Sequence, residues 1–221
     1  MKRVPEQELM DDPVQAEAYA KSDFTEPHEA FVALFRRTFP VFTGGLIADL
    51  GCGNADPTIR FARAYPQVKL VGFDGSDPMI AFGNAAIEEA GLSGRIVLEK
   101  RILPGHGYPS RSFDGVISNS FLHQLHDPRG LWQTVKELAK QGAPVFIMDL
   151  TRPPTEEDAH KLVALHTQEG DPEPMKKDYF NSLCAAFHPE EVRAQLDAYG
   201  LSELHVEVVS DRHMVVWGVA P

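Results

Sequence analysis

Short, continuously apolar runs alternate with segments of helical periodicity through the middle of the chain. Five of these runs predict β-strands, at 46–50, 68–73, 96–99, 113–118 and 144–150. Runs that are apolar on both faces and are separated by helices are typical of a parallel sheet covered by helices on both sides. The sequence therefore predicts an α/β doubly wound core over about residues 45–150.

Helix starts within this core carry a repeated Asp-Pro signal, at 56–57, 77–78 and 127–128. An aspartate can accept hydrogen bonds from the N–H groups of the first turn. A proline fits the first helical position because the N–H it lacks would have no partner there. We therefore expect helices to begin at these sites, and two of them to end at Gly91 and Gly142.

The segments on either side of the core predict smaller additions to one domain that spans all 221 residues. Two helical patterns, at 14–22 and 27–38, indicate an N-terminal helical cap over residues 1–40. The insertion at 151–187 contains two more, and insertions at this edge of an open sheet commonly form lids over the ligand site. Residues 188–221 predict a helix and then a β-hairpin, so that a seven-stranded, mostly parallel sheet ends in an antiparallel strand.

Composition and charge narrow the class of protein. Hydrophobic residues make up 43% of the chain and charged residues 24%, as in ordinary soluble globular proteins. The 32 acidic and 21 basic residues give a net charge of −11, which disfavours nucleic acid as a partner. Two cysteines suit a reducing cytoplasm, and we find neither a secretory signal nor an apolar run of membrane-spanning length. These features predict a cytoplasmic protein with a small-molecule substrate.

The most informative segment joins the first predicted strand to the helix after it, and runs from Asp49 through Gly51 and Gly53 to Asp56. Glycines at such a turn let the backbone approach a ligand closely. A dinucleotide fingerprint would need glycine at position 56, but this chain has Asp56, which we expect to cap the helix. Its carboxylate and that of Asp49 would oppose a pyrophosphate and favour an ammonium or a sulfonium.

A second acidic position follows the second predicted strand. Asp74 lies 25 residues beyond Asp49 (74 − 49), close to the ~20-residue offset at which an acidic residue binds ribose hydroxyls in such folds. Capping of the next helix is the alternative role for Asp74, although Ser76 and Asp77 are nearer to that helix. A nucleoside with a positively charged, phosphate-free tail satisfies both acidic positions, and S-adenosylmethionine (SAM) is such a molecule.

These motifs resemble those of the class I SAM-dependent methyltransferases. Asp49–Gly53 is similar to their first motif, 72–80 to the second, in which the acid holds the ribose and Met79 would flank adenine, and 112–119 to the fourth-strand motif. The resemblance implies a Rossmann-like sheet with SAM as cofactor and S-adenosylhomocysteine (SAH) as product. The family often has Gly-Asp-Ala after the third strand, where this chain has Lys100-Arg101-Ile102-Leu103, so backbone groups near Arg101 and Ile102 are expected to serve the adenine instead.

Eleven residues are expected to bind the cofactor: Tyr19, Asp49, Gly51, Gly53, Asp74, Gly75, Ser76, Met79, Arg101, Ile102 and Asn119. Tyr19 is among them because N-terminal helices often cover the site in the family that the chain resembles. Asp149, Tyr179 and Asn181 are candidate substrate contacts. The alternatives are that Asp149 caps Thr151-Arg152 and that the other two residues only pack within the lid.

His123 is the candidate catalytic residue. It follows the fourth predicted strand, where the substrate should meet the methyl group, and an imidazole there could deprotonate a hydroxyl or an amine at neutral pH. A hydrogen-bonded packing histidine is an equally weighted alternative. His123 and His126 form His-x-x-His, but no further Cys or His pair stands nearby at ligand spacing, so we expect no metal.

The leading hypothesis is a SAM-dependent methyltransferase that acts on a small molecule. A SAM- or nucleoside-binding protein without catalysis is the first alternative, because binding and transfer share the same glycine loop. An NAD(P)-dependent oxidoreductase is the second; Asp56 and the lack of a Tyr-x-x-x-Lys set weigh against it. The sequence does not indicate the acceptor, the atom that is methylated or the oligomeric state.

Overall fold

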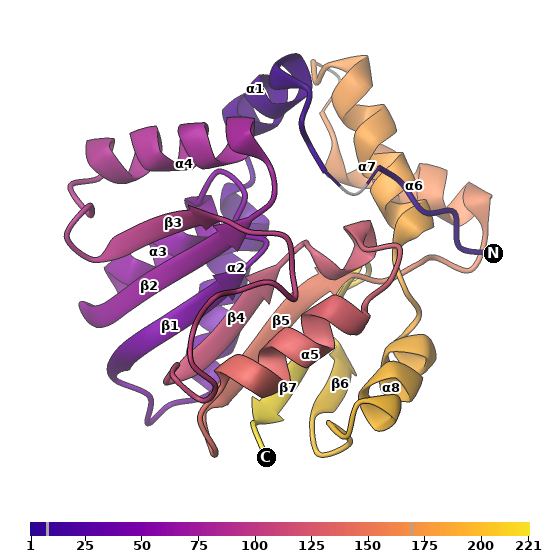
Figure 1. Ribbon diagram of the computed structural model, residues 1–221. Helices are drawn as coiled ribbons and strands as arrows, with labels where there is room; N and C mark the ends of the chain where they lie inside the picture. Colours follow the sequence, from indigo (N-terminus) through magenta and orange to yellow (C-terminus); the bar gives the residue numbers. More distant parts are fainter. Residues whose placement is uncertain (8, 169) are drawn as a thin grey trace.

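A seven-stranded sheet forms the centre of the computed structural model, which describes residues 1–7, 9–168 and 170–221 (Figure 1). The strand order is β3-β2-β1-β4-β5-β7-β6. The strands are β1 (Gly44–Leu50), β2 (Gln67–Asp74), β3 (Ile96–Lys100), β4 (Gly115–Asn119), β5 (Pro144–Leu150), β6 (His205–Val208) and β7 (His213–Val219). β1 to β5 pair in parallel, and β7 is antiparallel to both of its neighbours. This confirms the predicted doubly wound sheet with one reversed strand near its C-terminal end.

Eight α-helices and one 3-10 turn surround the sheet within the described residues. They are α1 (Pro13–Lys21), α2 (Thr25–Thr38), α3 (Asp56–Ala64), α4 (Asp77–Glu89), η1 (Leu122–Gln124), α5 (Arg129–Leu138), α6 (Glu156–His166), α7 (Glu173–Ala185) and α8 (Pro189–Ala198). None of the helices described is both long enough and apolar enough to cross a membrane.

Both faces of the sheet are buried, and β5 shows why its sequence is continuously apolar. Val145 and Ile147 point into the cluster formed with α5 and α8, whereas Phe146 points into the cluster on the opposite face. That second cluster contains aromatic side chains from α2 and α3. The ring centroid of Phe35 lies 4.8 Å from that of Phe61 and 5.6 Å from that of Phe146. Successive side chains of a strand alternate between faces, so a strand between two helical layers needs apolar residues at every position.

The start of α3 corrects a detail of the prediction. Asp56 is the first residue of this helix and not its cap; the cap is Ala55, in a left-handed conformation with φ 64°. The Asp56 carboxylate instead lies 2.6 Å from Nδ1 of His28, on α2, and accepts a hydrogen bond of 2.9 Å from Nε of Arg60. At α4 the cap is Ser76, one residue before the Asp-Pro pair. The predicted capping role of Asp56 is wrong because its carboxylate is held by His28 of α2 and by Arg60 one turn further along α3.

The end of α5 differs as well. The helix stops at Leu138, and not at Gly142. The backbone N–H of Lys140 donates to the carbonyl of Phe113, and Ala139 forms an isolated parallel bridge with the same residue, so the chain becomes extended before the glycine. Gly142, with φ 76°, then turns the chain into β5.

The N-terminal residues are only partly helical. Within the predicted cap, α1 and α2 are helices, but residues 1–7 and 9–12 have no regular secondary structure. In Figure 1 this indigo segment runs from the side of α6 and α7 to α1, which lies beside α4. It crosses the edge of the sheet where the parallel strands end at their carboxyl side.

Candidate active site

A pocket lies at the carboxyl edge of the sheet, where β1 and β4 are neighbours and the chain order reverses, the usual ligand position in open α/β sheets. Eight of the eleven residues expected to bind SAM line it, all but Ser76, Arg101 and Ile102. The complete lining is Leu9, Met10, Tyr19, Asp49, Gly51, Cys52, Gly53, Asn54, Pro57, Asp74, Gly75, Met79, Asn119, Ser120, Phe121 and Gln124.

The glycine loop forms one wall of the pocket, and at Gly51 there is no room for a side chain. Gly51 and Gly53 have φ values of 70° and 51°. A Cβ on Gly51 would lie 2.2 Å from Cγ of Phe121, so the loop packs directly against the turn that follows β4. The N–H groups of Gly51 and Cys52 both donate to the carbonyl of Phe73 at the end of β2, at 2.8 and 3.1 Å.

Asp74 is fixed at the end of β2 by two backbone donors. Its Oδ2 accepts from the N–H of Gly53 and its Oδ1 from that of Ser76, both at 2.9 Å. Burial raises the pKa of this carboxyl despite those hydrogen bonds. Each carboxylate oxygen has a second lone pair, so Asp74 can also accept hydrogen bonds from a vicinal diol in the pocket.

Asp49 lies deeper, at the end of β1, with only 2% of its surface exposed. Its Oδ2 accepts a hydrogen bond of 2.5 Å from Oγ1 of Thr58, on α3. Burial raises the pKa of Asp49 to about 7. A cation in the pocket would favour the ionised carboxylate and would be attracted by it in return.

Asn119 presents an unused acceptor at the end of β4. Its side chain is buried, and Nδ2 donates to Oγ of Ser120 at 3.2 Å. Its Oδ1 is buried and has no partner among the described residues. Such an atom normally costs about 1–3 kcal/mol, which a ligand donor would recover. An unpartnered oxygen, two carboxylates and a loop that admits close backbone approach fit SAM, whose ends carry an ammonium and a ribose.

The three expected residues outside the pocket lie beside it. Ser76 caps α4, and its hydroxyl donates to the carbonyl of Met10 at 2.7 Å. Arg101 pairs with Glu99 through its guanidinium, and its N–H donates to the Asp74 carbonyl at 2.8 Å. Ile102 is 68% exposed. Cofactor contacts by these three residues stay predictions.

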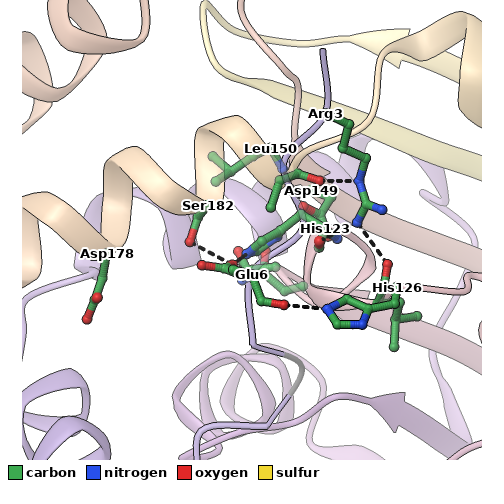
Figure 2. Close-up of polar contacts among 12 residues, drawn as sticks. Arg3, Glu6, His123, His126, Asp149, Leu150, Asp178 and Ser182 are labelled. Atoms are coloured by element: carbon green, nitrogen blue, oxygen red, sulfur yellow. Dashed lines mark hydrogen bonds and ion pairs between the residues drawn. The ribbon is translucent and has the colours of Figure 1, made fainter. Parts of the chain in front are cut away.

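His123 and Asp149 form a buried pair (Figure 2), and His123 lies on η1 between Phe121 and Gln124, which both line the pocket. Nδ1 of His123 lies 2.6 Å from Oδ1 of Asp149, and the backbone N–H of His123 lies 3.3 Å from Oδ2. Because a carboxylate accepts, the hydrogen belongs on Nδ1, and Nε2 of the neutral ring keeps a lone pair. Burial alone would lower the pKa of His123, but the carboxylate of Asp149 outweighs it and raises that pKa.

A second carboxylate faces the other side of this imidazole. Oε1 of Glu6 lies 3.4 Å from Nε2 of His123, and burial raises the pKa of Glu6. The backbone carbonyl of Glu6 lies 2.6 Å from Nε2 of His126. Both histidines of the His-x-x-His sequence therefore contact Glu6, His123 through the carboxylate and His126 through the backbone carbonyl. Over the described part of the chain, no three His, Cys, Asp or Glu side chains are grouped as metal ligands.

The substrate candidates have different surroundings. Asp149 does not cap Thr151-Arg152, whose N–H groups donate to the carbonyls of Arg212 and Phe187; it holds His123 instead. Tyr179 packs in the apolar cluster between α6, α7 and the end of β5, and burial raises its pKa to about 12. Its hydroxyl is buried without a partner among the residues described.

Asn181 lies on α7 and is partly buried. Its contact with a substrate stays a prediction, as does that of Tyr179.

Sequence reasoning missed the contribution of the N-terminal segment. Leu9 and Met10 line the pocket, and Arg3 and Glu6 contact the residues around His123. No motif marks these positions, because only the path of the chain brings them to the site. The further lining residues Pro57, Ser120, Phe121 and Gln124 are different, since each adjoins a recognised motif and adjacency could have indicated them.

The sheet order, the glycine loop and the acidic residue after β2 define the class I SAM-dependent methyltransferase fold. Residues 47–144, less than half of the chain, match the family model described as a methyltransferase domain. Among solved structures, a SAM-dependent methyltransferase from Aquifex aeolicus superposes with a TM-score of 0.68 over 93% of this chain and 97% of that one, at 16% identity.

Two curated relatives each match about half of the chain. The 27-O-demethylrifamycin SV methyltransferase of Amycolatopsis mediterranei is 31% identical over 46% of this chain and 36% of its own length. The ubiquinone/menaquinone biosynthesis C-methyltransferase of Geobacter sulfurreducens is 29% identical over 50% of this chain and 43% of its own length. The matches thus span less than half of either relative.

Proposed function

We propose that this protein transfers the methyl group of SAM to a small-molecule acceptor that loses a proton when it is methylated. The observation that carries the proposal is the buried His123–Asp149 pair at the turn after β4, where the flanking residues Phe121 and Gln124 line the pocket. The glycine loop and Asp74 would bind the cofactor, and His123 would take the proton that the acceptor loses.

The chain supplies a polar group for each charged or hydroxylated part of SAM. Asp74 would accept hydrogen bonds from the ribose, and Oδ1 of Asn119 with the carboxylate of Asp49 would hold the cationic amino acid end. Tyr19 and Met79 line the same pocket and would exclude water. When bound, SAM supplies an electrophilic methyl carbon on its sulfonium, so the protein has mainly to position the acceptor in line.

His123 would take the proton of the acceptor. A lone pair of the acceptor forms the bond to the methyl carbon, the carbon–sulfur bond breaks with its electrons on sulfur to leave SAH, and the proton moves to Nε2 of His123. Asp149 holds Nδ1–H and stabilises the imidazolium that results. The relatives support a small acceptor, because one is named as a rifamycin methyltransferase and the other as a quinone biosynthesis methyltransferase. The net charge of −11 supports it as well.

Calorimetric titration with SAM, SAH and NAD in parallel tests the cofactor. We expect micromolar binding of the first two and no binding of NAD. Binding of NAD alone would move the protein to the oxidoreductases.

A screen of phenols, hydroxy acids and amines for SAH release then tests transfer. His123→Ala should bind SAM as the wild type does but should transfer more slowly to any acceptor that must be deprotonated. An undiminished rate would make His123 a packing residue, and SAM binding without turnover across the screen would favour the non-catalytic alternative.

A further inference from the structure

The first seven residues are docked on the acceptor side of the site, and Arg3 anchors them. Its guanidinium donates to three backbone carbonyls, those of Ala185 at 2.5 Å, His123 at 2.9 Å and Leu125 at 2.8 Å. It also lies 3.8 Å from the ring centroid of Phe187. These contacts join the segment to α7 and to η1 at once (Figure 2).

This anchor brings the carboxylate of Glu6 to the reactive side of His123. Oε1 of Glu6 accepts a hydrogen bond of 3.1 Å from Oγ of Ser182, on α7, and the same oxygen lies 3.4 Å from Nε2 of His123. Figure 2 shows Glu6 between Ser182 and His123. Oε1 of Glu6 therefore lies between the hydroxyl of Ser182 and the imidazole of His123.

Glu6 hinders the approach of an acceptor to His123. A base must come within about 2.6–3.2 Å of the atom whose proton it takes, and Oε1, 3.4 Å from Nε2, obstructs an atom that approaches to that distance. The carboxylates of Glu6 and Asp149 also face both ring nitrogens, which favours an imidazolium that has no lone pair to accept a proton.

We propose that Nε2 of His123 and Oγ of Ser182 form the subsite for the acceptor oxygen, and that Glu6 occupies it until the acceptor displaces residues 1–7. The proposal rests on the proposed role of His123 as the base. A subsite that holds a carboxylate oxygen between a hydroxyl donor and an imidazole suits an acidic hydroxyl, such as a phenol or an enol. Ser182 donates to that oxygen and positions it, while the proton of the hydroxyl passes to His123.

Chemical modification of His123 tests whether residues 1–7 shield its imidazole, and it requires neither SAM nor an acceptor. Diethyl pyrocarbonate acylates neutral imidazole nitrogens, and peptide mass spectrometry resolves each histidine. We expect Glu6→Ala, Glu6→Gln and Arg3→Ala to raise the modification rate of His123 several-fold. The exposed His205 is the internal reference, and Glu203→Gln, at an exposed carboxylate, is the matched charge control.

An unchanged rate at His123 in all three variants, with circular dichroism confirming that they are folded, overturns the proposal. Since this readout needs neither ligand, its failure is distinct from a failure of the proposed function, which would appear as absent SAM binding or absent transfer.

Steady-state kinetics with the acceptor found by the screen tests the subsite itself. We expect Glu6→Ala to lower the KM of the acceptor, because competition for His123 is removed. Ser182→Ala should raise that KM several-fold while the Kd of SAM stays the same. A higher KM in Glu6→Ala would overturn the proposal, because Glu6 would then be an acceptor contact and not a competitor.

Discussion

Asp74 and Asn119 show how much a single residue can indicate in advance. The offset of Asp74 from the glycine loop was enough to predict a ribose contact. Its two backbone hydrogen bonds, from Gly53 and Ser76, are consistent with that role because they fix the carboxylate at the pocket wall. Asn119 was indicated only by its resemblance to a motif. The structure adds a physical reason to expect a ligand at Asn119, because its Oδ1 is an acceptor atom buried without a partner among the residues described.

The Asp74 contact gives the first prediction. Asp74→Ala would remove the proposed charge-assisted hydrogen bond to the ribose, so we expect a loss of about 1.5–3 kcal/mol in SAM affinity, measured by calorimetry. Asp77→Ala, at an exposed carboxylate three residues on, is the control and should bind SAM like the wild type. Unchanged affinity in a folded Asp74→Ala protein would remove Asp74 from the site.

The pair of His123 and Asp149 gives a prediction about pH. The carboxylate raises the pKa of His123, and only the neutral ring can take a proton, so transfer should increase as the pH rises through this raised pKa. In Asp149→Asn that pKa falls, and the rising part of the pH–rate profile should move to lower pH. Asp197→Asn, on α8, should leave the profile in place. A profile that does not move in Asp149→Asn would contradict proton transfer to His123.

Among the helices and strands, the predicted and observed structures differ mainly at the turns and loops where elements begin and end. The strands differ from their predicted bounds by one or two residues, since their apolar runs are set by burial on both faces. The start of α3 could not be predicted correctly because Asp56 is held by His28, which lies 28 residues earlier in the sequence. A capping signal is local, whereas the competing ion pair depends on how α2 packs against α3.

Gly51 and Gly91 have similar φ values, so substitutions at these two positions distinguish the cost of backbone strain from the cost of a steric clash. Gly51→Ala and Gly91→Ala each place a side chain at φ near 70°, which costs about 1–2 kcal/mol. The added Cβ at position 91 meets nothing within 4 Å, whereas at position 51 it collides with Phe121. We expect a further loss of about 1–3 kcal/mol in the free energy of unfolding for Gly51→Ala.

Urea denaturation measures this difference, and calorimetry should show loss of SAM binding in Gly51→Ala alone. Equal stability and equal affinity in the two variants would mean that the loop after β1 is not packed against Phe121.

At the scale of the whole molecule, the net charge of −11 bears on the class of acceptor. Proteins that bind RNA through its backbone neutralise phosphates with basic side chains, and this chain has an excess of acidic ones. We expect filter-binding assays with ribosomal RNA to show no retention, even at about 50 mM salt, where electrostatic binding is strongest. Micromolar binding that weakens with added salt would contradict a small-molecule acceptor and favour RNA.

The layers of the fold, the glycine loop and the acidic residue after β2 could be predicted from the amino-acid pattern. These features are local, because burial, backbone conformation and strand ends leave patterns within a few residues. The surroundings of His123, in contrast, depend on how distant parts of the chain pack together. Asp149 reaches it from a neighbouring strand, and Glu6 and Arg3 reach it from a segment more than a hundred residues away. No periodicity records such contacts, since they depend on the path that the chain takes across the edge of the folded sheet.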